Sequence, residues 1–169
     1  DLSSIAKGYS VQLIHEYLLK NNLNNHLIDI GGEVIINGNI HGNSWKVGIQ
    51  DPSSYSDKPI YIIENSNKYL SIATSGEYRN FIVLDNGKTI SHTINPETLN
   101  SISSNVSSVT VVHENSATYA DAYATALNVM GGLEAMNFAN KNDIALMLSF
   151  LNDGEVVLKF SNKWYDLGL

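Results

Sequence analysis

Residues 118–132 read Thr-Tyr-Ala-Asp-Ala-Tyr-Ala-Thr-Ala-Leu-Asn-Val-Met-Gly-Gly, and the rest of the chain can be arranged around this segment. Ala, Leu and Met are strong helix formers and a glycine pair is a common helix stop, so we predict a helix over residues 118–130. Most of its side chains are small and apolar, which indicates that most of its faces are buried. The helix is therefore expected to lie inside the fold.

Three polar residues of this helix, Asp121, Thr125 and Asn128, share one stripe because they are spaced i, i+4 and i+7. A carboxylate and a hydroxyl on an apolar helix need polar partners, and a hard cation such as Mg²⁺ or Ca²⁺ would supply one. The alternative is a helix cap, since Thr118-x-x-Asp121 matches a capping box and an acidic first turn suits the helix dipole. The cap gives Thr125 no role, and this segment alone leaves both interpretations open.

A second helix is predicted over residues 5–19, with Ser3 or Ser4 as the natural N-cap. Its apolar residues recur at every fourth position and are expected to form the buried face: Ile5, Tyr9, Leu13 and Tyr17. A helix start with free N–H groups and Lys7 in its first turn would suit an anion. A plain capped surface helix is the alternative.

Most of the remaining chain reads as short strands bounded by turn residues. We predict strands at residues 26–30, 33–36, 45–50, 60–63, 69–74, 81–84, 88–91, 106–112, 143–151 and 155–160, a hairpin-type turn at Asn37-Gly38, and a short helix at 133–140. Many antiparallel strands with a few packed helices make an α+β fold. A length of 169 residues suits a single domain over residues 1–169.

Composition excludes several classes of function. The net charge of -7 argues against a general nucleic-acid binder, which would carry a basic patch. The chain has no Cys, and therefore no disulfide and no thiolate nucleophile or metal ligand. Apolar runs are too short to span a membrane. Neither a G-x-G-x-x-G after a strand, nor a G-x-x-x-x-G-K, nor a G-x-S-x-G is present, and no His pair has zinc spacing.

Five histidines are present, and an ordinary surface or half-buried role is the alternative for each. His92 differs by its context, because it stands at a predicted strand end, close to Pro96, where loops tend to carry function. Imidazole titrates near neutral pH, so His92 is a candidate proton acceptor.

Residues 1–9 read Asp-Leu-Ser-Ser-Ile-Ala-Lys-Gly-Tyr. They resemble the Asp-Leu-Gly-x-Ile-Ala-Lys-Gly-Tyr signature of the ApbE family. Further blocks follow in the family's order at residues 30–33 (Ile-Gly-Gly-Glu), 45–52 (Trp-Lys-Val-Gly-Ile-Gln-Asp-Pro), 73–78 (Ala-Thr-Ser-Gly-Glu-Tyr), 91–96 (Ser-His-Thr-Ile-Asn-Pro) and 120–127 (Ala-Asp-Ala-Tyr-Ala-Thr-Ala-Leu). Together they cover residues 1 to about 131 and resemble the C-terminal part of the family, so an N-terminal part is expected to be absent.

The resemblance implies an FAD:protein FMN transferase, which uses Mg²⁺ to move FMN from FAD onto a threonine hydroxyl of a target flavoprotein and releases AMP. It implies a metal site made by Asp121, Thr125 and the backbone carbonyl of Ser4. It also implies a catalytic role for His92. The residues that match the family's FAD contacts are Asp1, Lys7 and the backbone near Ile94. Many members are envelope lipoproteins, which implies a cell-envelope or periplasmic location and a possible lipid anchor.

Two departures from the family pattern concern the block around His92. Asn95 stands where the family often has Asp, and residues 98–101 read Thr-Leu-Asn-Ser where a Thr-Gly-x-Pro turn is usual. Neither change removes a predicted metal ligand. Two other functions stay open, an FAD-binding or carrier module without transfer and a Mg²⁺-dependent hydrolase of the FAD pyrophosphate. Asp121 or a residue of the N-terminal part is the alternative proton acceptor.

Overall fold

A computed structural model describes residues 2–51, 58–76, 81–83, 89–91, 93–102, 106–152 and 155–169. Its main sheet has six strands in the order β1-β2-β7-β10-β11-β12, and every neighbouring pair is antiparallel. These strands are β1 (His26–Ile30), β2 (Glu33–Asn37), β7 (Leu70–Gly76), β10 (Val106–His113), β11 (Ala145–Asn152) and β12 (Glu155–Phe160). The α+β prediction with a mostly antiparallel sheet is confirmed.

Three smaller antiparallel pairs accompany the main sheet. They are β3 (Asn39–Ile40) with β4 (Asn43–Ser44), β5 (Lys46–Gln50) with β6 (Pro59–Glu64), and β8 (Phe81–Val83) with β9 (Thr89–Ser91). The helices are α1 (Ser3–Lys20), α2 (Ala117–Met130), α3 (Gly132–Lys141) and α4 (Asn162–Asp166). Within the described ranges, none of the helices has the length and hydropathy needed to cross a membrane.

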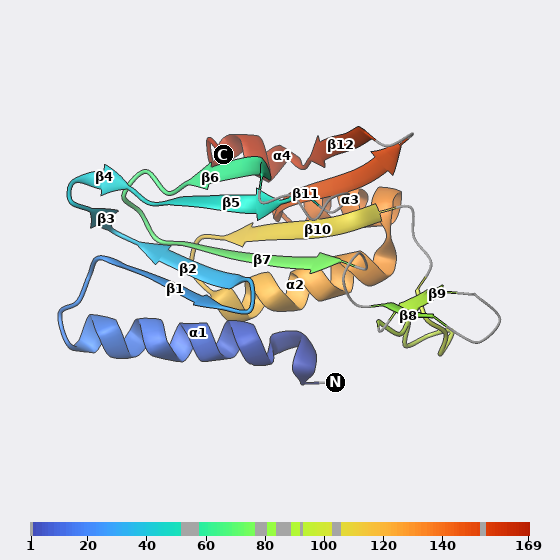
Figure 1. The fold of residues 1–169 in the computed structure, drawn as a ribbon, viewed down its shortest axis with the longest axis horizontal. Helices are drawn as coiled ribbons and strands as arrows, with labels where there is room; N and C mark the ends of the chain where they lie inside the picture. The colour runs from blue at the N-terminus through green and yellow to red at the C-terminus, as the bar shows by residue number, and fades with distance from the viewer. Residues whose placement is uncertain are drawn as a thin grey trace.

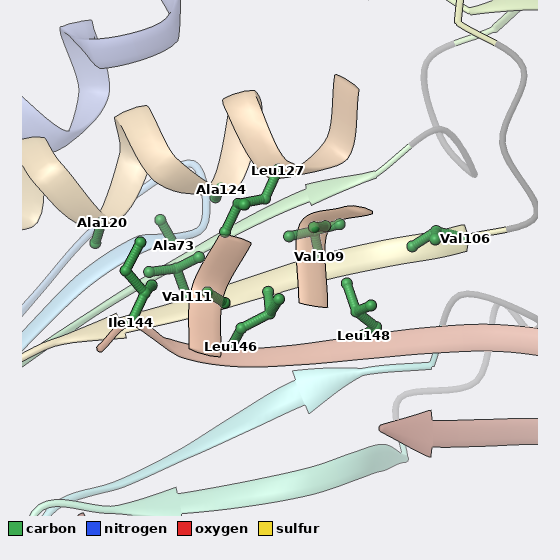
Figure 2. Packing of buried hydrophobic residues seen from close by; sticks show 12 residues of the cluster. Ala73, Val106, Val109, Val111, Ala120, Ala124, Leu127, Ile144, Leu146 and Leu148 are labelled. Atoms are coloured by element: carbon green, nitrogen blue, oxygen red, sulfur yellow. The ribbon is translucent and has the colours of Figure 1, made fainter. Parts of the chain in front are cut away.

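Helices α2 and α3 cover one face of the sheet, and the β5–β6 pair with α4 covers the other. Ala73 of β7 belongs to the apolar cluster that includes Leu127 of α2, whereas Ile72 belongs to the cluster that includes Ile63 of β6 and Trp164 of α4. Figure 2 shows side chains of α2 facing those of β10 and β11 in the first cluster. Full burial of a side chain such as Leu127 contributes about 1.5–3 kcal/mol, so these two layers hold the sheet.

The first helix forms where predicted but buries a different face. Gly8, Val11 and His15 are its buried residues, whereas Tyr9 and Tyr17 of the predicted buried ladder are 53% and 66% exposed. The reason is the neighbouring helix, since α1 packs along α2 as well as along β1 and β2 (Figure 1). The predicted serine N-cap is wrong too, because Leu2 occupies that position and makes no capping hydrogen bond with its side chain.

The capping box predicted for the central helix does not form. The N-cap of α2 is Ser116, whose hydroxyl accepts a hydrogen bond from the Tyr119 N–H at 3.3 Å. Thr118 therefore lies inside the helix, and Asp121 is left for another role. Ser and Thr are both good caps two residues apart, so sequence preference alone could not choose between them.

Two tight turns connect neighbouring strands, and a short helix lies near the C-terminal end. Gly31-Gly32, both at positive φ, form the tight turn between β1 and β2, in which Ile30 pairs with Glu33. The hairpin turn predicted at Asn37-Gly38 lies instead at His41-Gly42, between β3 and β4. The segment α4 was not predicted, because a five-residue helix is too short to show a period.

Candidate functional site

The site begins where α1 crosses α2. The Gly8 N–H donates a hydrogen bond of 2.8 Å to Oδ2 of Asp121, although the two residues are 113 positions apart. A Cβ atom at position 8 would collide with the Ala117 carbonyl and with the Asp121 side chain. Gly8 therefore allows the close approach that brings the first turns of α1 beside Asp121.

A cavity of about 630 Å³ opens beside this crossing. Five parts of the chain line it, namely the start of α1, the beginning of β2, the end of β7, the segment after β9 and the stripe of α2. Its lining residues are Ser3, Ser4, Lys7, Glu33, Thr74, Ser75, Gly76, Thr93, Ile94, Pro96, Asp121, Thr125 and Val129. The cavity thus lies at one end of the sheet, next to the crossing of α1 and α2.

Five of the seven predicted site residues come together in this cavity: Ser4, Lys7, Ile94, Asp121 and Thr125. Their individual roles stay predictions. The other two, Asp1 and His92, lie outside the described residues. The third residue of the α2 stripe, Asn128, is fully buried and its amide donates to the Ser75 hydroxyl at 3.3 Å, so it joins the helix to β7.

Two carboxyl groups in the cavity wall are buried beside one ammonium group. Asp121 is 4% exposed and Glu33 is 3% exposed. Burial raises the pKa of Asp121, while the Gly8 N–H and the charge of Lys7 oppose that rise. Burial also raises the pKa of Glu33, opposed by Lys7 and reinforced by the charge of Asp121. The two carboxyl groups outnumber the one ammonium group, so an additional cation would be favourable at this wall.

The donor set fits a hard cation. The cavity is lined by Asp121, which has a carboxylate, by Thr125, which has a hydroxyl, and by Ser4, which has backbone and side-chain oxygens. Mg²⁺ prefers oxygen ligands, of which one or two are usually protein carboxylates. The described part of the chain holds no group of three or more His, Cys, Asp or Glu side chains that could bind a metal unaided. A metal here would accordingly need oxygens from water or from a substrate phosphate.

A second cavity of about 380 Å³ lies against the first and shares Lys7, Thr74 and Gly76 with it. It opens towards the β5 side of the sheet. The rest of its lining is Asp29, Gly31, Gly32, Val34, Val47, Gly48, Ile49, Gln50 and Ile72. Lys7 thus stands at the junction of the two cavities, and glycine and aliphatic residues make up most of the second cavity's lining.

Glu33 also lines the cavity, although no role was predicted for it. It was visible as a charged residue directly after the glycine pair and before Val34, Ile35 and Ile36, which are all buried. A charge at the start of such an apolar strand is unusual unless it has a partner. That signal indicated a buried ion pair but could not show that Lys7 supplies it.

The sequence profile of the ApbE family matches residues 1–148. The chain belongs to the ApbE family. It is 36% identical over 168 residues to the FAD:protein FMN transferase of Haemophilus influenzae, with 99% of this chain and 48% of that protein aligned. It is 40% identical over 156 residues to the FAD:protein FMN transferase of Vibrio cholerae, with 91% and 46% aligned.

Solved ApbE structures share the fold. The flavin transferase ApbE from Vibrio cholerae superposes with a TM-score of 0.79 at 33% identity, over 98% of this chain and 52% of that one. The apo form of the flavinyl transferase ApbE from Pseudomonas stutzeri gives 0.82 at 28% identity, over 99% and 50%. The chain thus spans about half the length of these relatives.

Proposed function

We propose that this chain carries the flavin-transfer site of an FAD:protein FMN transferase. The reaction is Mg²⁺-dependent transfer of FMN from FAD to a threonine hydroxyl of a target flavoprotein, with release of AMP. The observation that carries the proposal is the meeting of Ser4, Lys7, Asp121 and Thr125 in one cavity of about 630 Å³. The names of the relatives supply the flavin and the protein acceptor.

The main requirement of this reaction is the stabilisation of negative charge on the phosphate oxygens. The acceptor oxygen forms a bond to the phosphorus of the FMN half, the pyrophosphate P–O bond breaks, and AMP leaves with the bridging oxygen. Lys7, at the junction of the two cavities, can stabilise charge on the phosphate oxygens. Asp121, held by the Gly8 N–H, and the Thr125 hydroxyl would hold the metal. A bound Mg²⁺ would supply charge neutralisation on the pyrophosphate oxygens.

The proton of the acceptor hydroxyl needs a base, and we assign this role to His92. Its reference pKa of about 6.5 suits proton transfer near neutral pH. Thr93 and Ile94, which follow it in the sequence, line the cavity, and this supports the assignment. If His92 is the base, His92→Asn will slow single-turnover transfer roughly 10²–10⁴-fold with little change in FAD affinity. Loss of affinity at an unchanged saturated rate would reject the role.

Incubation with FAD, Mg²⁺ and a candidate acceptor protein tests the proposed function. Flavin fluorescence that stays on the acceptor after denaturation, together with AMP in the supernatant, supports transfer. Release of free FMN and AMP without labelled acceptor would show a pyrophosphatase, and retention of intact FAD would show a binding module. Either result overturns the proposal. The cell-envelope location is a separate proposal, which cell fractionation checks.

A further inference from the structure

Glu33 is a buried carboxylate for which the proposed mechanism has no task. It is the first residue of β2, directly after the tight turn at Gly31-Gly32, and 3% of its surface is exposed. Val34 and Ile35, which follow it, are also buried. The strand therefore holds the Glu33 backbone firmly, and burial leaves its side chain little freedom to turn towards water.

Lys7 is held by acceptors of the β1–β2 turn. Its Nζ atom lies 2.6 Å from Oε2 of Glu33 and donates a long hydrogen bond of 3.5 Å to the Gly31 carbonyl oxygen. The Lys7 side chain is still 48% exposed and lines both cavities. Since an ammonium group has three N–H donors, the two contacts leave a donor for a ligand in the cavities.

We propose that Glu33 is a positioning residue, which fixes the ammonium of Lys7 at the junction of the two cavities for contact with a diphosphate. Lysine is a flexible side chain that loses considerable rotamer freedom when it is ordered on a ligand. A buried carboxylate on a strand orders it in advance, so binding a diphosphate no longer has to do so. The identity of the ligand as FAD rests on the proposed function, whereas the restraint on Lys7 does not.

Charge gives Glu33 a second effect on the site. With both carboxylates ionised, Glu33, Asp121 and Lys7 together carry one net negative charge. This charge disfavours the binding of an anion alone and favours the binding of an anion together with a divalent cation. Replacement of Glu33 by neutral Gln therefore has opposite effects on two ligands. It frees Lys7, which weakens binding of a metal–diphosphate complex, and it removes the repulsion felt by a metal-free diphosphate.

A double-mutant cycle tests whether Glu33 acts through Lys7. The variants are Glu33→Gln, Lys7→Met and their combination, and the probes are FAD and inorganic pyrophosphate, each titrated calorimetrically with and without Mg²⁺. We expect Glu33→Gln to weaken Mg²⁺-dependent binding about tenfold, and to weaken it much less in the Lys7→Met background, where only its charge effect is left. Glu33→Asp keeps the charge but shortens the side chain, and is expected to restore only part of the affinity.

The matched control is the pair of Lys46 and Glu64, whose Nζ and Oε2 atoms lie 3.1 Å apart between β5 and β6; neither residue lines either of these cavities. Glu64→Gln should leave every affinity unchanged. Additive losses for Glu33→Gln and Lys7→Met would show that Glu33 merely stabilises the fold and would overturn the proposal.

A ligand-free measurement separates this proposal from the proposed function. Nitrogen relaxation of the Lys7 ammonium is expected to report a restrained group in the wild type and a mobile one in Glu33→Gln. Equal mobility in both proteins overturns the positioning role. A restrained Lys7 and a non-additive cycle with pyrophosphate, in a protein that transfers no flavin, would retain the positioning role and reject the transferase.

Discussion

At the scale of single residues, the site depends on one glycine and one carboxylate. Gly8 lets two helices touch, and its N–H is the donor that holds Asp121. The burial of Asp121 is unfavourable for a charged carboxylate, and a cation bound beside it would compensate this cost. Substitution of Gly8 is therefore expected to lower the stability of the fold, whereas substitution of Asp121 by a neutral residue is expected to raise it.

The Gly8→Ala variant is expected to be destabilised even though Ala favours helices. The new methyl group would collide with the Ala117 carbonyl and the Asp121 side chain, and such overpacking costs about 1–3 kcal/mol. Urea unfolding measures the change in the free energy of unfolding. Tyr9→Ala, at an exposed position of the same helix, is the control and should change it by less than about 0.5 kcal/mol. A Gly8→Ala protein as stable as the wild type would mean that the helices do not approach this closely.

The Asp121→Asn variant should lose Mg²⁺-dependent FAD binding and gain stability in the absence of metal. Burial raises the pKa of Asp121, so the folded state binds its proton more tightly than the unfolded state does. Its contribution to stability is therefore lost as pH rises from about 3.9 through the raised folded pKa. The Asn side chain cannot ionise, and thermal unfolding with EDTA at pH 7 should show a higher Tm than the wild type.

Asp143→Asn is the control for this variant, because the Asp143 side chain is 75% exposed, and neither it nor its partner Lys163 lines the cavity. It should change neither the FAD affinity nor the Tm appreciably. Undiminished Mg²⁺-dependent binding in Asp121→Asn would exclude Asp121 as a metal ligand.

At the scale of elements, α1 is joined to its surroundings by a buried polar network. Nδ1 of His26 lies 2.8 Å from the Leu23 carbonyl oxygen, so this nitrogen carries the proton. Nε2 of His26 then accepts from Nδ1–H of His15, at 2.8 Å. Gln12, one turn earlier, accepts hydrogen bonds from the Tyr69 hydroxyl and from the Ala117 N–H. The network links α1 to β1, to the start of β7 and to α2.

This network predicts a loss of stability in mild acid. Burial lowers the pKa of His15, the charge of His26 lowers it further and Glu16 opposes both. The folded state thus binds fewer protons than the unfolded state below about pH 6.5, and stability falls as pH drops from there through the lowered folded pKa. Urea unfolding at pH 5 to 8 should show this slope, and His15→Gln should reduce it.

Some slope should survive in His15→Gln, since burial also lowers the pKa of His113. His41→Asn is the control, because His41 is exposed in the turn between β3 and β4. A wild-type slope in His15→Gln would place the titration elsewhere.

Element positions were largely predictable from the sequence, but their faces and contacts were not. Alternation and periodicity located the main strands and the first two helices, because these signals arise within each segment. The buried face of α1 was predicted wrongly, since the packing of α2 against Gly8 turns Val11 and His15 inwards instead of the Tyr9 ladder. Contacts between residues far apart in sequence, such as Lys7 with Glu33, have no local signal.

At the scale of the whole molecule, the chain spans about half the length of its relatives. Apolar residues remain on the surface of α1, where Tyr9, Leu13 and Tyr17 are 53%, 46% and 66% exposed. The described residues nevertheless bring together the predicted metal ligands and Lys7. We therefore predict that the phosphate and metal contacts lie within this chain, and that part of the contacts to the rings of FAD comes from the other half of the relatives' length.

This division predicts that the chain binds FAD more weakly than a full-length relative but binds inorganic pyrophosphate with Mg²⁺ about equally well. The pyrophosphate contacts Lys7 and the proposed metal site, which lie within the chain. The rings of FAD need a large apolar contact area, and about half of each relative is not represented here. Calorimetric titrations of this chain and of the Vibrio cholerae protein, with both ligands under the same conditions, measure the two ratios. Asp121→Asn should abolish the Mg²⁺-dependent part for both ligands, which shows that they use one site. Equal FAD affinities would mean that the chain carries the whole flavin site, and a weaker pyrophosphate affinity would mean that the phosphate site needs residues from outside it.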